Sequence, residues 1–93
     1  MNSVEIKQRQ SDLSAFMASS LYAERQASLG LDIAANAEQI LSLVPDSDLN
    51  IACLLQLHGA RQNIIQSLHE FEVLRANLDA KLQETLESEN AHA

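Results

Sequence analysis

The sequence contains few aromatic residues, glycines, prolines and cysteines. Only 3% of its 93 residues are Phe, Trp or Tyr, and there are two Gly, one Pro and one Cys. The single cysteine, Cys53, cannot form an internal disulfide. Val, Ile and Thr, which favour strands, are also sparse. Leu, Ala, Gln, Ser and Glu dominate instead, and most of these are good helix formers, so the composition predicts an all-α protein.

The chain is short, and 46% of its residues are apolar. That fraction is too high for a disordered segment, and the length allows one domain with little room for a core of its own. We therefore expect residues 1–93 to form a single helical domain.

Basic residues are also few, and they are scattered along the chain. There are six Lys and Arg against 13 Asp and Glu, which gives a net charge of −7. Phosphate backbones and anionic lipid surfaces both require clustered cations, so neither nucleic acid nor a membrane is an expected partner. No apolar run is long enough to span a membrane, and residues 1–12 lack the apolar core of a signal peptide. We expect a cytoplasmic protein.

No group of residues forms a recognisable catalytic, cofactor or metal site. His58 and His69 share a helix face, with Cys53 and Glu72 nearby in sequence, but they are eleven residues apart. On one helix that spacing separates the two histidines by about 16 Å, too far for one metal ion. Paired carboxylates would need a pocket, which two helices alone do not provide. We expect a protein that is not an enzyme and that binds neither a cofactor nor a metal.

The only proline predicts where one helix ends and another begins. Proline disfavours helical backbone angles in the residue before it, so a first helix should end by about Leu43 or Val44. Asp46 or Ser47 can then cap a second helix, whose first turn is favoured by the negative charge of the next residue, Asp48. A short polar link between long helices predicts an antiparallel helical hairpin broken at Pro45.

The expected first helix runs from Ser11 or Asp12 to Leu43, and the second from about Asp48 to about Leu86. Residues 1–10 and 88–93 should fray. Gly30 is the weak point of the first helix: it could bend or divide that helix, or permit close packing.

Each expected helix carries apolar residues at alternating spacings of four and three. In the second helix they form a seam of mostly large side chains: Cys53, Leu57, Ala60, Ile64, Ser67, Phe71, Leu74 and Leu78, widened by Leu54, Leu68 and Leu82. In the first helix they form a small-residue strip: Phe16, Ser20, Ala23, Ala27, Gly30, Ala34, Ala37 and Leu41. A strip this small allows close approach, so we expect it to face the seam, with Ala27 and Gly30 near Ile64 and Leu68.

The first helix has a second set of apolar residues, which lies about a third of a turn from the strip. This aliphatic row consists of Tyr22, Leu29, Ile33, Ile40 and Leu43. A two-helix hairpin can bury only one of the two faces, and an exposed apolar face usually marks an interface. We therefore predict that the aliphatic row binds a partner, or that two hairpins pack through it into a bundle. The alternative is that the first helix bends at Gly30 and wraps this row onto its own chain.

One stretch of the expected second helix resembles a known family. "LLQLHGARQNIIQSLHEF", from Leu54 to Phe71, is similar to the second helix of the small helical-hairpin co-chaperones of the type III secretion needle subunit. This chain is longer at its N-terminus than many members. The resemblance implies a bacterial hairpin that binds a second chaperone, the two together keeping an aggregation-prone needle subunit monomeric in the cytoplasm.

The sequence thus favours a small acidic module that binds helical proteins, itself or both, as a cytoplasmic chaperone or adaptor in a homo-oligomer or hetero-complex. The alternative is a structural protomer of a helical filament or of a phage or secretion assembly, since such proteins share this composition.

Overall fold

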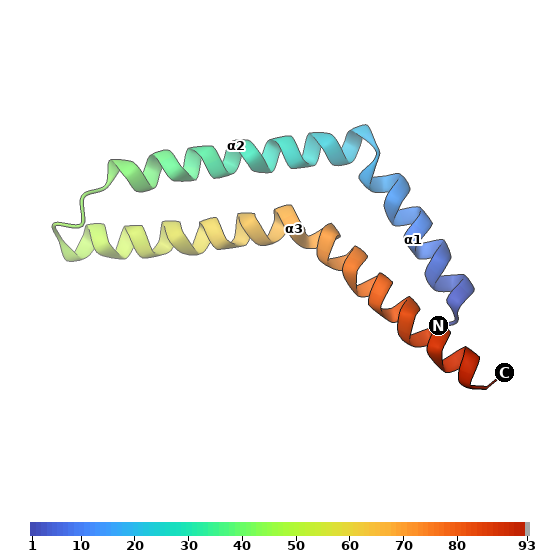
Figure 1. Ribbon diagram of the computed structural model, residues 1–93. Helices are drawn as coiled ribbons and strands as arrows, with labels where there is room; N and C mark the ends of the chain where they lie inside the picture. The colour runs from blue at the N-terminus through green and yellow to red at the C-terminus, as the bar shows by residue number, and fades with distance from the viewer. Residues whose placement is uncertain (93) are drawn as a thin grey trace. The chain divides into compact units, whose positions relative to one another are not determined.

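The computed structural model describes residues 1–92 and consists of three helices: α1 (Ser3–Met17), α2 (Ser20–Ser42) and α3 (Asp48–Ala91) (Figure 1). No strand occurs among these residues. The predicted all-α class is confirmed. The helices form two compact units, which are described separately: Met1–Ala23 with Glu70–Ala93, and Glu24–His69.

The turn between α2 and α3 lies at the proline, as predicted. The Ser47 hydroxyl accepts a hydrogen bond from the Asn50 backbone N–H at 3.1 Å, so Ser47 is the N-cap of α3, and Asp48 places a negative charge in the first turn. The Asn50 side chain also donates to the Val44 carbonyl at 2.9 Å. This bond ties the loop around Pro45 to the start of the helix.

The prediction of a first helix from Ser11 or Asp12 to Leu43, weakest at Gly30, is wrong, because α1 ends at Met17 and α2 begins at Ser20. Ser19 causes the break. Its hydroxyl donates to the Phe16 carbonyl at 2.6 Å and accepts from the Tyr22 backbone N–H at 3.2 Å. One serine thus closes the first helix and caps the second.

Residues 1–10, which we expected to fray, belong mostly to α1. The Asn2 side chain caps this helix by accepting from the Glu5 backbone N–H at 2.9 Å. Ile6 is fully buried, and Leu13 is 8% exposed. These two apolar residues of the mostly polar α1 therefore form the core of the unit of Met1–Ala23 and Glu70–Ala93. Their burial stabilises the packing of α1 in this unit.

In the unit of Met1–Ala23 and Glu70–Ala93, α1 and the end of α3 run in opposite directions. Ser3 bonds to Glu89 through its backbone N–H and its hydroxyl, at 3.1 and 2.8 Å, and Gln10 donates to Asp79 at 2.7 Å. The α3 helix continues to Ala91, so most of the segment 88–93 is helical, and residue 93 lies outside the described residues.

All three aromatic residues of the chain meet in this same unit. The ring centroids of Phe16 and Phe71 lie 5.0 Å apart, and Tyr22 lies 5.5 Å from Phe16 and 5.9 Å from Phe71. Edge-on and tilted contacts of this kind are favourable between aromatic rings. Phe16 and Tyr22 flank Ser19 in sequence, so their contact with each other and with Phe71 supports the break between α1 and α2.

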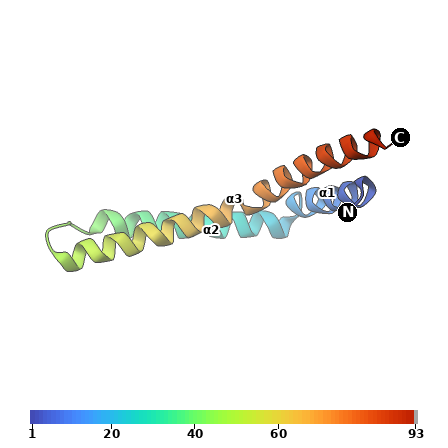
Figure 2. The same cartoon turned by 90° about the horizontal axis from the view of Figure 1, so that it is seen from below.

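In the unit Glu24–His69, α2 and α3 lie side by side in both views of the ribbon (Figure 1 and Figure 2). Gln26 donates to the Leu68 carbonyl and Asn36 to the Leu57 carbonyl, both at 2.9 Å. The bonded residues are 42 positions apart in the first pair and 21 in the second, which lies nearer the loop. The two helices therefore run in opposite directions here.

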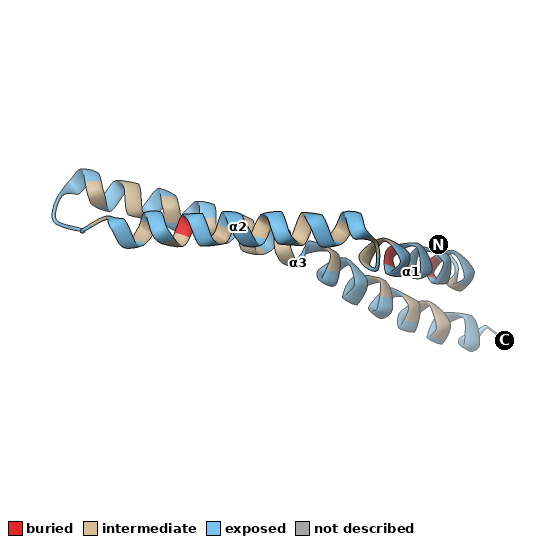
Figure 3. Ribbon diagram, turned by 90° about the horizontal axis from the view of Figure 1, so that it is seen from above, coloured by how far each residue is buried: buried red, intermediate tan, exposed pale blue. Residues whose placement is uncertain are grey.

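Full burial is rare in the part of the chain that the structure describes. Ile6 and Leu13 are its buried hydrophobic residues, and Asn36 is its buried polar residue. Most of each helix is half-buried or exposed (Figure 3). Within residues 1–92 no helix combines the length and the hydropathy needed to cross a membrane.

Replacing Ser19 by Ala removes the cap of α2 and should lower the free energy of unfolding by about 0.5–2 kcal/mol. Ser20→Ala, at the neighbouring exposed serine, is the control and should change it by less than about 0.5 kcal/mol. Urea unfolding followed by circular dichroism measures both. Equal effects of the two substitutions would show that Ser19 does not cap α2.

The contact between Ser3 and Glu89 should weaken in acid. The side-chain and backbone hydrogen bonds from Ser3 lower the pKa of Glu89 below its ordinary value of 4.5. A lowered folded-state pKa means that the contact stabilises α1 above about pH 4.5 and is lost as the pH falls through the folded pKa. Amide hydrogen exchange at Ser3 should therefore lose protection on acidification, and in Glu89→Gln this pH dependence should disappear. Exchange at Ser3 that is equally pH-dependent in both proteins would contradict the contact.

Candidate protein-binding surface

The face of α2 that carries the aliphatic row is turned toward α3 in the unit Glu24–His69. Four members of the row belong to this unit, and each is half-buried: Leu29, Ile33, Ile40 and Leu43. Asn36 lies on the same face, is 5% exposed and bonds to the Leu57 carbonyl of α3. Tyr22, the fifth member, is half-buried in the other unit, against Phe16 and Phe71.

The small-residue strip, which we expected to face the seam, mostly points away from it in this unit, where Ala37 is its half-buried member. Ala27, Gly30 and Ala34 are exposed, and Leu41 is 85% exposed. A methyl group added at Gly30 would meet no atom within 4 Å. The predicted packing of Ala27 and Gly30 against the seam is therefore wrong.

The two faces of α2 differ in the apolar area that each can bury. Leu and Ile side chains remove far more apolar surface from water than Ala and Gly do, at roughly 25 cal/mol for each Å². The aliphatic row therefore packs on its own chain, as in the alternative that the sequence left open. No break is needed for this, because α2 continues through Gly30.

The seam of α3 is largely as predicted. Within the unit Glu24–His69 its half-buried members are Cys53, Leu54, Leu57, Ile64, Ser67 and Leu68, whereas Ala60 is exposed. In the other unit Phe71, Leu78 and Leu82 are half-buried, and Leu74 remains 44% exposed.

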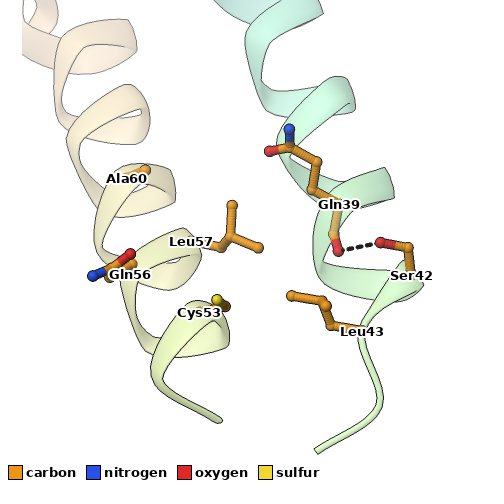
Figure 4. Close-up of a pocket in the computed structure, with 7 residues that line it drawn as sticks. All are labelled: Gln39, Ser42, Leu43, Cys53, Gln56, Leu57 and Ala60. Atoms are coloured by element: carbon orange, nitrogen blue, oxygen red, sulfur yellow. Dashed lines mark hydrogen bonds between the residues drawn. The ribbon is translucent and has the colours of Figure 1, made fainter. Parts of the chain in front are cut away.

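Near the loop, the seam between α2 and α3 opens into an apolar groove of about 520 Å³. Leu43, which follows the end of α2, points toward Leu57 and Cys53 of α3, while Gln39, Ser42 and Gln56 provide polar groups at the edges of the groove (Figure 4). No charged residue lines this groove. It offers apolar contact and nothing that could act as an acid, a base or a nucleophile with a paired base.

A second groove of the same helix pair has a volume of about 340 Å³ and is lined by Ala37, Ile40, Leu41, His58, Arg61 and Gln62. His58 and His69 are both exposed. Among the residues that the structure describes, no three His, Cys, Asp or Glu side chains are grouped so as to hold a metal.

The outward face of α2 carries a regular pattern that sequence reasoning missed in part. This outer stripe consists of Glu24, Ala27, Leu31, Ala34, Glu38 and Leu41, and all six residues are exposed. At 100° per residue it lies about half a turn from the aliphatic row. Leu31, which belongs to neither face assigned from the sequence, is 73% exposed. Its spacing of seven from Glu24 and from Glu38 could have identified it.

Hydrogen bonds from α2 side chains to α3 keep the outer stripe on the side of α2 that faces away from α3. Arg25 donates to the Ser67 carbonyl at 2.9 Å, and Gln26 and Asn36 donate to the carbonyls of Leu68 and Leu57. These three bonds fix the rotation of α2 about its own axis as well as its register along α3. The side-chain amide oxygen of Asn36 is buried and has no hydrogen-bond partner in the structure, so Asn36 provides register at a cost in stability.

Comparison of the chain with protein-family models, with curated proteins and with solved structures finds no match.

The opposite placement of Ile33 and Leu31 can be tested by truncation. Ile33→Ala removes a contact with α3 and should lower the free energy of unfolding by about 1–3 kcal/mol. Leu31→Ala is the matched control two residues away and should change it by less than about 0.5 kcal/mol. Urea unfolding measures both. A larger loss for Leu31→Ala than for Ile33→Ala would show that the outer stripe, and not the aliphatic row, faces α3.

Proposed function

We propose that this protein is a protein-binding module built as an antiparallel helical hairpin, whose outer stripe binds a helix of another protein. The observation that carries the proposal is the exposure of Leu31 and Leu41 on one regular helix face. Helices recognise other helices through apolar residues spaced in this way.

The exposed apolar residues of the unit Glu24–His69 support a binding role. Beyond the outer stripe, Val44 is 62% exposed, Leu49 73% and Leu55 68%. A short chain that buries so little gains a core by packing with another helical protein or with a second copy of itself. A bundle of this kind, as hetero-complex or homo-oligomer, is part of the proposal.

The partner surface proposed from the structure differs from the one that the sequence predicted. The aliphatic row packs against α3 through Leu29, Ile33, Ile40 and Leu43, so its use by a partner would require the hairpin to open. The outer stripe requires no such opening, because its side chains already contact solvent.

A chaperone or adaptor working in the cytoplasm is the form of this function that we favour. A co-chaperone of a secretion needle subunit is its narrowest form, and it rests only on the stretch from Leu54 to Phe71. Both forms require the same property, a helix face that holds another protein in a defined complex.

Affinity capture from the organism that encodes the chain tests the proposal. The tagged wild type should recover one protein at fixed stoichiometry, and the variant Leu31→Ser/Leu41→Ser should lose it because the apolar contacts of the outer stripe are gone. Val4→Ser/Val73→Ser is the matched control: it removes two exposed apolar side chains from the other unit and should retain the partner.

Circular dichroism should show the same helix content in all three proteins, since every substituted side chain is exposed. A wild type that recovers no protein at fixed stoichiometry and that sediments as a monomer would contradict the proposed function.

A further inference from the structure

The outer stripe of α2 has the arrangement of a coiled-coil seam with two acidic positions. Glu24, Leu31 and Glu38 follow one another at intervals of seven residues, and Ala27, Ala34 and Leu41 do so at the adjoining position. A heptad spacing of this kind keeps side chains in register with a second helix over its whole length. The stripe therefore combines apolar residues that can pack against the apolar face of another helix with negative charges at fixed positions.

The charge on this face of α2 has one sign. Glu24 and Glu38, which are both exposed, are the charged residues of the stripe. Arg25, the basic residue of α2, is half-buried and donates to the Ser67 carbonyl of α3 and to the Gln26 side chain. The stripe itself thus contains two carboxylates and no cation.

This charge pattern argues against a second copy of the chain as the occupant. In a parallel pair of outer stripes, Glu24 would face Glu24 of the other copy and Glu38 would face Glu38. In an antiparallel pair, Glu24 of one copy would lie near Glu38 of the other. Either arrangement brings like charges together in a contact that excludes water, which is costly. A helix that has Lys or Arg at the facing positions converts the same contacts into attraction.

From these charges and spacings we propose that the outer stripe binds a basic amphipathic helix of a partner protein, one with small or aliphatic residues along its contact face and Lys or Arg opposite Glu24 and Glu38. This inference rests on the proposed function and adds the chemistry of the partner. The same carboxylates repel nucleic-acid phosphates and anionic lipids, so the stripe favours a protein over either of these as its ligand.

Two labelled peptides of about 20 residues, long enough to form helix on contact, provide the test. Both carry Ala and Leu in the pattern of the outer stripe, with Gln and Ala elsewhere. One has Lys at the two positions that correspond to Glu24 and Glu38, and the other has Glu there. By fluorescence anisotropy the full chain should bind the Lys peptide at least about tenfold more tightly than the Glu peptide, and added salt should reduce the difference.

Substitutions in the chain assign the preference to the stripe. Glu24→Gln/Glu38→Gln should bind the two peptides equally, because the charges that distinguish them are gone. Glu84→Gln/Glu87→Gln, which makes the same change in net charge at exposed positions of α3, should keep the preference of the wild type. Leu31→Ser/Leu41→Ser should bind neither peptide.

Equal binding of both peptides by the wild type would overturn the inference, as would self-association of the wild type through Leu31 and Leu41. If the wild type binds neither peptide, yet captures a cellular protein that Leu31→Ser/Leu41→Ser does not, the basic partner is excluded and the proposed function stands.

Discussion

A helix packed against a single neighbour can bury only one of its faces, and the structure of the unit Glu24–His69 depends on this constraint. The α2 helix has two faces with apolar residues, and the one with larger side chains, including Ile33 and Ile40, packs against α3. Its opposite face is left in water with Leu31 and Leu41 exposed. The candidate surface is thus a consequence of packing, because the chain provides no third helix to cover this face within the unit.

Polar bonds determine which of the possible alignments of α2 and α3 is adopted. Apolar packing alone tolerates sliding by a turn, but the donors of Arg25, Gln26 and Asn36 reach particular carbonyls of α3. Asn36 is the most restrictive of the three, since it is buried and its side-chain amide oxygen accepts no hydrogen bond. A single buried Asn in an apolar helix contact commonly specifies register in this way.

Local signals in the sequence predicted the helical class, the break at Pro45 and a cap at Asp46 or Ser47, because each depends on neighbouring residues alone. The break at Ser19 was missed, although serine is a preferred N-cap residue, because the apolar spacing continues through it. The choice between the two faces of α2 could not be made from spacing. It depends on the area that each face buries against α3, and the outer stripe became apparent only when that choice was known.

Solvent exposure of the two faces of α2 in solution tests this account most directly. A soluble paramagnetic agent relaxes methyl groups that contact solvent, and it can be applied to the wild-type chain with labelled Leu and Ile methyls. The account predicts strong relaxation at Leu31 and Leu41 and weak relaxation at Ile33 and Ile40. Protected methyls at Leu31 and Leu41 together with strongly relaxed methyls at Ile33 and Ile40 would contradict it.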